Sequence, residues 1–463
     1  MENKILGDGS YGIVTLIDGY AVKKYKDNKI YDHSFIRELI CIKNLSHESI
    51  VEYYSIDIKH KTFKMKYYNY TFIDCIQQTL TCDIIDILYQ LMDVIKYIES
   101  QNICHRDIKP SNILINNIDT NSYIKLCDWS LSRSISDNST EFYTDEVETE
   151  WYRSPELKKE KYIHYNHKIE IYAIGIMLIQ YEIKQYIKIT TSIKNKFYRE
   201  QHNNENYKKI IFNMLKNNPN KRLSIDDVIC RLNLTNKNYE YITSINKQHI
   251  NIIYKDCEDI NISMRTILIE WLNEVVHEYT LSTMSFVITT NIIDNIIKNI
   301  KNIKRSKYQL LGICSLYIAS QFYDIRPISI NSCSYITDNT CTTSQISDYI
   351  YFILNNIDDY GIFIHNEYQW LLNITNNCSD NFKDLAFKIC SLIQIKPCKC
   401  KYINSKNIAY GIVKYVSIYL NERYEINGIS KINHNEIILT LKYIDDILED
   451  DYRYIDEIIN INL

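Results

Sequence analysis

A glycine-rich segment near the start of the chain has the spacing of a phosphate-binding loop. Gly7, Gly9 and Gly12 form the pattern GxGxxG, and Val14 follows; such patterns bring backbone amides close to phosphate oxygens. The chain has only nine glycines in 463 residues, far below the usual ~7%, so three at these positions are informative. A lone GxGxxG also fits the turn that opens a helix in dinucleotide-binding folds. Here strand-like residues flank the glycines and Lys23 follows in the next strand with no helix between, which favours a hairpin above phosphates.

Further polar residues that suit phosphate chemistry occur in short segments that follow in order. These segments are CHRDIKPSN at 104–112, KLCDWSLSR at 125–133, WYRSPE at 151–156 and NPNKR at 218–222. The first carries Asp107, Lys109 and Asn112, and the second carries Asp128. Carboxylate and amide oxygens are hard ligands that suit Mg²⁺, and phosphoryl transfer is catalysed mainly by positioning and charge neutralisation. Asp107 and Asn112 could instead only cap a turn, but that interpretation leaves the ordered set of motifs unexplained.

Together, these motifs resemble those of the eukaryotic protein kinase family over about residues 1–232. The resemblance implies a site for ATP and Mg²⁺. Its ATP-binding residues would be Leu6, Gly7, Gly9, Ser10, Gly12, Val14 and Lys23. Glu38 on the first helix would hold Lys23 against the α and β phosphates, and Asn112 and Asp128 would hold Mg²⁺. Asp107 would accept or orient the substrate hydroxyl, while Lys109 would neutralise charge on the transferred phosphoryl group.

The segments YTDEVETEWYRSPEL and SFIRELICIKNLSHESIV resemble the activation segment and first helix of cyclin-dependent kinases. By that resemblance Thr144 is an activating phosphorylation site, and Arg37, Arg106 and Arg133 form the clamp that binds its phosphate. Three guanidinium groups suit a dianionic phosphate. Ser10 and Tyr11 match inhibitory phosphorylation positions in the glycine loop, a weaker inference because hydroxyl residues are common there.

Four residues depart from the kinase pattern without removing a catalytic group: Trp129, Ser130, Glu148 and Glu170. The usual Asp-Phe-Gly is Asp128-Trp129-Ser130, which keeps the metal ligand but loses a flexible glycine, a change that we expect to bias the on/off equilibrium of the loop. Glu170 stands where the family has aspartate. Glu148 replaces an apolar residue of the pocket for proline after the target residue, so a Ser/Thr-Pro preference does not follow from the sequence.

The segmental pattern predicts a bilobal first half of the α+β class. Short strands rich in β-branched and aromatic residues are expected at 4–17, 20–26, 50–57 and 62–68, with a helix at 34–45 between them. From about residue 81 helical periodicity dominates. We therefore expect a small β lobe and a large α lobe in a kinase domain at 1–232, and a polar linker at 233–247.

The second half is predicted to be all-α. Helices are expected at 264–278, 286–300, 308–322, 344–356, 382–393, 405–421 and 434–448. The strings SMRTILIEWLNEVV and YQLLGICSLYIASQF resemble the cyclin box of A and B type cyclins. The resemblance implies a first cyclin-like helical repeat at 248–360, and a second at 361–463 for which the match is faint. An unrelated helical adaptor is the competing interpretation, because bundle-forming helices are common.

The cyclin resemblance assigns individual residues in this half. Arg265 and Asp294 match a buried ion pair between two helices, and Leu310 matches a core position. Four residues match a surface patch that docks substrates: Met264, Ile267, Trp271 and Gln309. Gln321 and Ile350 stand where cyclins carry the Lys and Glu that meet the kinase's first helix, so the usual contact surface is altered.

Composition limits the class of protein. The 57 acidic and 53 basic residues leave a formal net charge of −4, which gives no support to direct nucleic-acid binding. No signal sequence or membrane-length apolar run is evident, and the 14 cysteines lack CxxC spacing, so an intracellular protein with reduced thiols, cytoplasmic or nuclear, is expected. Of the 11 histidines only His164 and His167 are close together, and we expect them on a solvated loop. AT-rich coding bias and a fused regulator fit a large DNA virus or a parasite.

These features predict a cyclin-dependent-type Ser/Thr kinase with its cyclin-like activator fused to it, acting on protein substrates in cell-cycle or transcription control. Thr144 would be the target of an activating kinase, and the two halves could dock within one chain or between two chains. The alternative is a catalytically weak pseudokinase scaffold whose cyclin-like half sequesters cell-cycle proteins. Retention of Lys23, Glu38, Asp107, Asn112 and Asp128 argues against that alternative.

Overall fold

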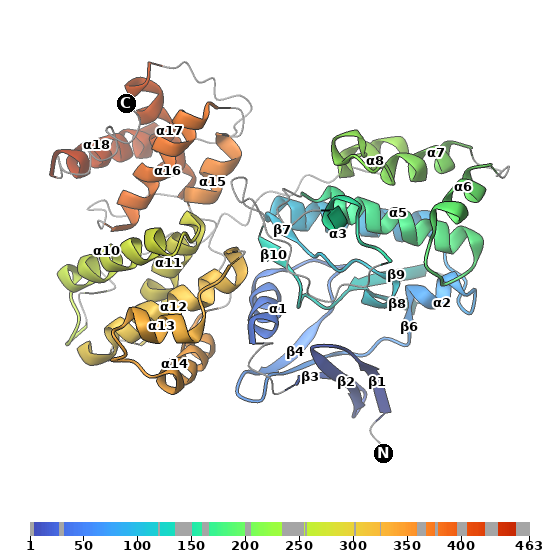
Figure 1. The fold of residues 1–463 in the computed structure, drawn as a ribbon, viewed down its shortest axis with the longest axis horizontal. Coiled ribbons are helices and arrows are strands. Elements are labelled where there is room, and N and C mark those ends of the chain that lie inside the picture. Colours follow the sequence, from blue (N-terminus) through green and yellow to red (C-terminus); the bar gives the residue numbers. More distant parts are fainter. Residues whose placement is uncertain are drawn as a thin grey trace. The chain divides into compact units, whose positions relative to one another are not determined.

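The computed structural model shows two compact units, Met1–Glu240 and Tyr241–Leu463, which we call the N-terminal and C-terminal units (Figure 1). The structure describes residues 4–26, 32–118, 121–134, 151–159, 166–199, 205–233, 254, 257–300, 302–324, 326–358, 367–375, 378–395, 405–421 and 434–450. The division between the units falls within 233–247, where the sequence predicts a linker.

A five-stranded antiparallel sheet begins the N-terminal unit. In spatial order its strands are β1 (Lys4–Asp8), β2 (Gly12–Ile17), β3 (Tyr20–Tyr25), β5 (Thr62–Lys66) and β4 (Tyr53–Asp57). In the central strand β3, Lys23 lies opposite Val14 on one side and Phe63 on the other. Because side chains alternate along a strand, Lys23 and Tyr25 share the buried face of β3.

Helix α1 (Asp32–Asn44) packs against this sheet through aromatic side chains. Phe35 stacks on Phe63 with ring centroids 5.2 Å apart and meets Tyr25 edge-on at 5.5 Å. Leu39, one turn further along α1, is completely buried. Since Glu38 precedes Leu39, this packing brings its carboxylate to the β3 residues that line the sheet's buried face.

The helical lobe is built around α3 (Ile84–Ser100) and α5 (Lys168–Ile183) (Figure 1). Helix α5 is apolar on nearly every side, as expected of a helix surrounded by protein. Its other helices are α2 (Phe72–Ile76), α4 (Glu156–Lys159), α6 (Thr191–Arg199), α7 (Glu205–Met214) and α8 (Ile225–Arg231), with 3₁₀ turns η2 (Pro110–Asn112) and η3 (Pro219–Lys221). A three-stranded sheet joins β6 (Tyr70–Thr71), β8 (Ile113–Ile118) and β9 (Asn121–Leu126), and β7 (Ile103–Cys104) pairs with β10 (Arg133–Ser134).

Two long-range contacts stabilise the helical lobe. Arg222 binds Glu156 through two hydrogen bonds of 2.7 and 2.8 Å, which join two of the sequence motifs. His167 is buried, and its Nε2 lies 2.7 Å from the carbonyl oxygen of Ile103. The prediction of a solvated loop is therefore wrong for His167, which sits at the start of α5 and packs against β7; His164 lies outside the described residues.

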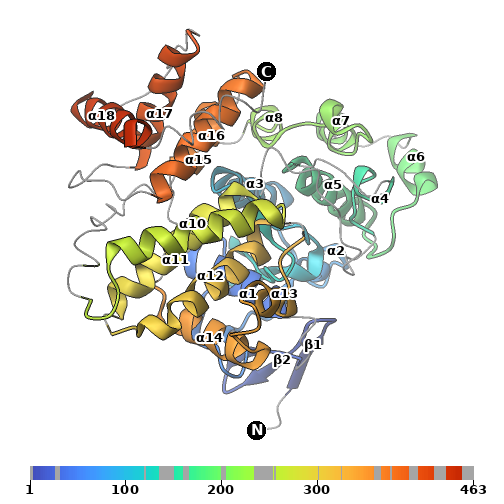
Figure 2. The same cartoon turned by 60° about the vertical axis from the view of Figure 1, so that its left-hand side comes forward.

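The C-terminal unit is helical in all of its described elements (Figure 2). Its first group is α10 (Ile262–Glu278), α11 (Thr283–Asn299), the 3₁₀ turn η4 (Arg305–Lys307), α12 (Tyr308–Tyr323), α13 (Ile330–Ile336) and α14 (Thr343–Asn356). Almost every side chain of α12 is buried, so α12 is the central helix. Gly312 lets α10 approach closely, because a Cβ there would lie 2.9 Å from Leu268.

A second helical group follows in the same unit. It comprises α15 (Glu367–Ile374), α16 (Asp380–Ile395), α17 (Ser405–Tyr419) and α18 (His434–Asp450). Arg265 of α10 donates hydrogen bonds of 3.0 and 3.3 Å to the carbonyls of Gln394 and Ile395 at the end of α16. One buried side chain therefore ties the two helical groups together.

The predicted fold class, a β lobe and an α lobe followed by an all-α half, is confirmed. All seven helices predicted for the second half occur, with ends shifted by a few residues. Helices α13 and α15 are absent from the predicted helix set. Both are short, seven and eight residues, and few turns give little periodicity to detect. No helix among the described residues is long and apolar enough to cross a membrane.

Candidate active site

The glycine segment forms the hairpin between β1 and β2. Gly9 N–H donates to Gly12 O at 3.0 Å and closes the turn. A Cβ at position 12 would lie 2.6 Å from the carbonyl oxygen of Lys24, so the close approach of β2 to β3 requires glycine there. Ser10 is exposed and Tyr11 half-buried in the same turn.

Lys23 forms ion pairs with two carboxylates. Its Nζ lies 2.6 Å from Glu38 Oε2 and 2.8 Å from Asp128 Oδ1. Burial by itself would lower the pKa of Lys23, but Asp128 and Glu38 outweigh it and raise the pKa above its ordinary value. Burial would likewise raise the pKa of Asp128, yet Lys23 holds it below its usual range. Lys23 is thus a permanent cation beside an ionised Asp128.

The residues after Asp128 hold its carboxylate in place. Trp129 is fully buried, with its ring centroid 4.7 Å from that of His105. Ser130 Oγ donates a 2.7 Å hydrogen bond to Asp128 Oδ1, the oxygen that also accepts from Lys23. Asp128 itself has a φ of +66°, a left-handed conformation that is strained for a residue with a side chain. The serine in place of the usual glycine is therefore a hydrogen-bond donor to the proposed metal ligand.

Asp107, Lys109 and Asn112 form a second cluster in the loop before β8. Lys109 Nζ lies 2.6 Å from Asp107 Oδ2. Asn112 Nδ2 donates at 2.9 Å both to Asp107 Oδ2 and to Asp107 O. Burial would lower the pKa of Lys109, but the adjacent Asp107 raises it. The loop thus presents a carboxylate whose orientation is fixed from two sides.

His105 supports this loop from beneath as a neutral imidazole. Its Nε2 lies 3.1 Å from Cys127 O, and its Nδ1 accepts a 3.3 Å hydrogen bond from Asp107 N–H. These partners require a proton on Nε2 and none on Nδ1. Burial lowers the pKa of His105 to about 4, with Asp128 opposing the shift. His105 belongs to the CHRDIKPSN motif at 104–112, but its role as a buried hydrogen-bond acceptor was not predicted.

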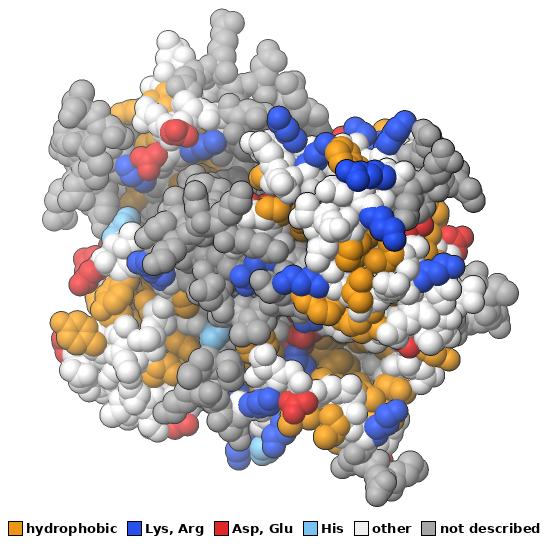
Figure 3. All heavy atoms as spheres, turned by 45° about the vertical axis from the view of Figure 1, so that its right-hand side comes forward, with side chains coloured by type: hydrophobic (Ala, Val, Ile, Leu, Met, Phe, Trp, Pro, Cys, Tyr) orange, Lys and Arg blue, Asp and Glu red, His pale blue; other side chains and the backbone are white. Residues whose placement is uncertain are grey.

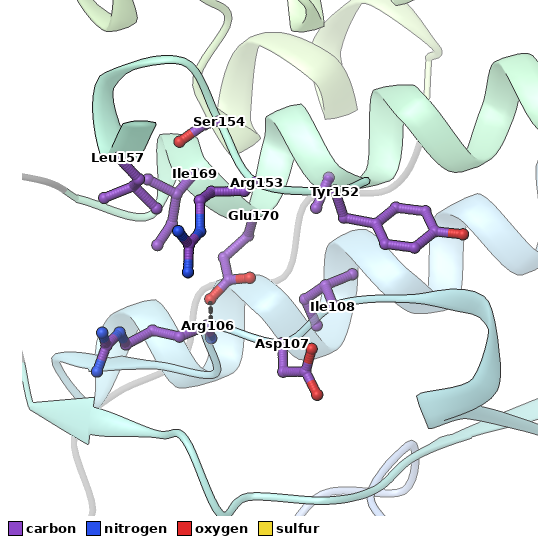
Figure 4. Close-up of a pocket in the computed structure, with 10 residues that line it drawn as sticks. Arg106, Asp107, Ile108, Tyr152, Arg153, Ser154, Leu157, Ile169 and Glu170 are labelled. Atoms are coloured by element: carbon purple, nitrogen blue, oxygen red, sulfur yellow. Dashed lines mark hydrogen bonds between the residues drawn. The ribbon is translucent and has the colours of Figure 1, made fainter. Parts of the chain in front are cut away.

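Glu170 stabilises a strained peptide next to Asp107 (Figure 4). Arg106 has a φ of +69°, and its backbone N–H donates 2.9 Å to Glu170 Oε1. In this view the side chain of Glu170 extends down from α5 toward Arg106, and the carboxylate of Asp107 points away from it. The longer side chain in place of aspartate is accommodated, since Glu170 is 1% exposed and hydrogen-bonded.

These groups converge on one cleft between the sheet and the helical lobe, with a volume of about 740 Å³. All the predicted ATP-site residues line it, as do Glu38, Asp107, Lys109, Asn112 and Asp128. In Figure 3, hydrophobic side chains gather on the surface in the right half of the view. An apolar cleft with a few convergent charged groups is typical of a nucleotide site.

The donor set suits Mg²⁺ bound together with phosphate. The described residues contain no group of three His, Cys, Asp or Glu side chains that could hold a metal by themselves. Asn112 uses its amide nitrogen on Asp107, and both donors to Asp128 use Oδ1. An amide oxygen and a carboxylate oxygen are therefore available as hard ligands, and Mg²⁺ usually completes its shell with water and substrate phosphates.

The predicted phosphate clamp is only partly described. Thr144 and Glu148 lie outside the described residues. Arg37, Arg106 and Arg133 are all buried, at 1%, 7% and 4% exposed. Pairing of β10 with β7 places Arg133 opposite Cys104, two residues before Arg106. That Arg37 joins them to bind a phosphate stays a prediction.

In the C-terminal unit, the predicted ion pair is present: Arg265 binds Asp294 through hydrogen bonds of 2.9 and 2.8 Å. Leu310 is buried, as predicted for a core position. In the proposed docking patch Ile267 is 66% exposed, Gln309 is exposed, and Met264 and Trp271 are half-buried. Gln321 donates to Ile328 O at 3.2 Å, and Ile350 is buried.

Comparison with known families agrees with this geometry. The protein kinase domain model matches residues 1–232, and the cyclin N-terminal domain model matches residues 235–358. Mitogen-activated protein kinase 13 of Arabidopsis thaliana is 33% identical over 194 residues, covering 38% of this chain and 52% of that protein. Cyclin-dependent kinase-like 2 of Rattus norvegicus is 32% identical over 191 residues, covering 38% of this chain and 37% of that protein.

Mitogen-activated protein kinase 10 of Oryza sativa subsp. japonica is 32% identical over 203 residues, covering 38% of this chain and 32% of that protein. The chain thus spans between about a third and about half of the length of these relatives. The kinase match alone covers half of the chain. The chain belongs to the protein kinase family, and a cyclin N-terminal domain follows its kinase domain.

Proposed function

We propose that this chain is a Ser/Thr protein kinase of the cyclin-dependent type whose cyclin-like activator is part of the same polypeptide. One observation carries the catalytic part of the proposal. Lys23 is paired with both Glu38 and Asp128 in the cleft that also contains Asp107 and Asn112. Those groups are the ones that phosphoryl transfer between ATP and a hydroxyl needs.

The proposed chemistry assigns one task to each group. Lys23, held by Glu38, binds the α and β phosphates of ATP, and Asp128 and Asn112 hold Mg²⁺, which neutralises charge on the phosphates when bound. Asp107 accepts the hydrogen bond of the substrate hydroxyl and receives its proton as the hydroxyl oxygen bonds to the γ-phosphorus. The bond between that phosphorus and the oxygen bridging it to the β-phosphate breaks, and ADP leaves with the bridging oxygen. Lys109, 2.6 Å from Asp107, neutralises charge on the transferred group.

The cyclin-dependent type is supported by the cyclin match and by the three clamp arginines. Tethering makes the encounter of kinase and cyclin-like domain intramolecular, at an effective concentration of ~mM for a short flexible linker. We therefore propose that the chain needs no separate cyclin and that phosphorylation of Thr144 activates it further. The substrates are proteins of cell-cycle or transcription control in the cytoplasm or nucleus, phosphorylated on Ser or Thr. They bind to the docking patch around Ile267.

Phosphate transfer from ATP to linker histone by the purified full chain, with no cyclin added, tests the proposal. Asp107→Asn should reduce transfer by ~100-fold or more, because it removes the acceptor of the hydroxyl proton. Asp86→Asn, an exposed acid on α3, is the matched control and should retain full activity. Residues 1–240, a compact unit, should fold but transfer less phosphate than the full chain.

No transfer by the full chain, even after an activating kinase has been added, would contradict the proposal and leave a scaffold function in its place. Equal transfer by 1–240 and the full chain would retain the kinase assignment but refute activation by the cyclin-like half.

A further inference from the structure

The buried carboxylate of Glu38 accepts hydrogen bonds from more than its usual lysine partner. Glu38 is 0% exposed. Oε2 accepts from Lys23 Nζ at 2.6 Å and also from the hydroxyl of Tyr25, while Oε1 lies 3.4 Å from the hydroxyl of Tyr53. A buried charge is costly unless it is both paired and hydrogen-bonded. Strands β3 and β4 therefore each supply a phenol to the carboxylate on α1.

Among the described residues, both acceptors within hydrogen-bonding distance of the Tyr25 hydroxyl lie on α1. Tyr25 is 2% exposed, and its ring meets Phe35 at 5.5 Å and Phe63 at 6.0 Å, both edge-on. Its second acceptor is Ser34 O at 3.3 Å, which is also on α1. The ring cannot turn away without disturbing this aromatic packing.

Lys23 alone is a weak anchor for Glu38 because it has two other tasks. It is shared with Asp128, 2.8 Å away, and it lines the cleft where phosphates would compete for its remaining N–H donors. Tyr25 is not among the residues that line this cleft, and both acceptors of its hydroxyl among the described residues, Glu38 and Ser34, lie on α1. Burial, reinforced by Glu38 and Asp128, raises the pKa of Tyr25 well above its ordinary value, so the phenol keeps its proton and remains a donor.

We propose that Tyr25 is a positioning residue that holds Glu38, and through it Lys23, in place whether or not nucleotide is bound. The N-terminal unit thereby holds α1 in place with a side chain of its own, in addition to any action of the cyclin-like half. The effect on catalysis rests on the proposed function, whereas the effect on nucleotide binding is independent of it.

The test uses the full chain and Tyr25→Phe, which removes one hydroxyl and leaves the ring. Binding of a fluorescent ATP analogue with Mg²⁺ should weaken about 5-fold or more, as expected when a charged group loses a hydrogen bond. Transfer to linker histone should fall in parallel. The matched control is Tyr20→Phe on the same strand, where the ring of Tyr20 contacts Tyr54 and Lys64. This change should leave both analogue binding and phosphate transfer unchanged.

A double-mutant cycle separates positioning from a general loss of structure. In a Glu38→Gln background, the Tyr25→Phe change should no longer alter analogue binding, because its acceptor charge is already gone. An equal loss in both backgrounds, or no difference between Tyr25→Phe and Tyr20→Phe, would overturn the inference. If the wild-type chain transfers no phosphate but Tyr25→Phe still weakens binding as stated, the inference stands and the proposed function fails.

Discussion

At the scale of single residues, Ser130 orients the carboxylate of Asp128. Its hydroxyl is buried and donates to Asp128 Oδ1 at 2.7 Å. We expect Ser130→Ala to raise the Mg²⁺ concentration needed for half-maximal transfer by ~10-fold, the cost of a hydrogen bond to a charged group. Ser130→Gly should raise it further, because glycine also frees the backbone at this point.

Ser132→Ala is the matched control for the Mg²⁺ titration. Ser132 is equally buried in the same segment, but its hydroxyl donates to His105 O at 3.3 Å and not to a carboxylate. Ser132→Ala should leave the Mg²⁺ concentration for half-maximal transfer unchanged. Ser130→Thr, which keeps a hydroxyl, should need a Mg²⁺ concentration close to that of the wild type. An identical response of the two alanine variants would show that Ser130 has no special role at Asp128.

The neutral state of His105 predicts a loss of stability in acid. The pKa of His105 is about 4 in the folded chain, against 6.5 ordinarily, because burial disfavours the charged ring. Its contribution is fully present above pH 6.5 and is lost as the pH falls through 4, because the unfolded chain takes up the proton first. His105 alone should therefore remove up to about 3 kcal/mol from the free energy of unfolding of the N-terminal unit across this window.

Urea unfolding between pH 7 and pH 4 measures this effect. His105→Gln keeps one donor and one acceptor but cannot be protonated, so its stability should fall less steeply with acid than that of the wild type. His60→Gln, on an exposed turn between β4 and β5, should keep the wild-type slope. Indistinguishable slopes for wild type and His105→Gln would mean that other groups govern the acid response.

At the scale of elements, Arg265 joins the two helical groups of the C-terminal unit. It binds Asp294 of α11 and the carbonyls of Gln394 and Ile395, with its side chain 0% exposed. Removing one partner of a buried pair leaves an uncompensated charge, so Arg265→Met should lower the free energy of unfolding of this unit by about 3–5 kcal/mol.

Hydrogen exchange reports the effect locally. Amides of α10 and of the end of α16 should exchange faster in Arg265→Met. The control is Lys298→Met, which breaks a half-exposed pair with Asp358 at 3.6 Å and should cost less than about 1 kcal/mol. Faster exchange in α10 alone, with α16 as in the wild type, would exclude the coupling role.

At the scale of the whole molecule, the covalent link predicts activity that does not depend on enzyme concentration. If the cyclin-like half acts on the kinase of its own chain, the specific activity should stay constant over about a 100-fold dilution, because the effective concentration is set by the linker. A fall on dilution would indicate docking between two chains. The Asp107→Asn full chain, which keeps the cyclin-like half, should then activate residues 1–240 when the two are mixed.

The glycine, lysine and aspartate motifs could be read directly from the chain. Glycine is scarce here, with nine in 463 residues, so Gly7, Gly9 and Gly12 stand out. Strands and long helices were also predictable, because their periodicity extends over several turns or alternations. The sequence did not predict the short helices α13 and α15 or the burial of His167. Each of these depends on what packs against a short segment.

The sequence by itself therefore determined the family, the order of the lobes and the residues whose chemistry suits phosphoryl transfer. Only the tertiary structure showed that Tyr25 donates to Glu38 and Ser130 to Asp128. The chain has 41 tyrosines, so one tyrosine on β3 carries no signal of its own. Its role arises when Phe35 packs α1 against the sheet and turns a carboxylate toward a phenol 13 positions away in the chain. Such contacts are set by side-chain packing between elements, which local residue patterns do not encode.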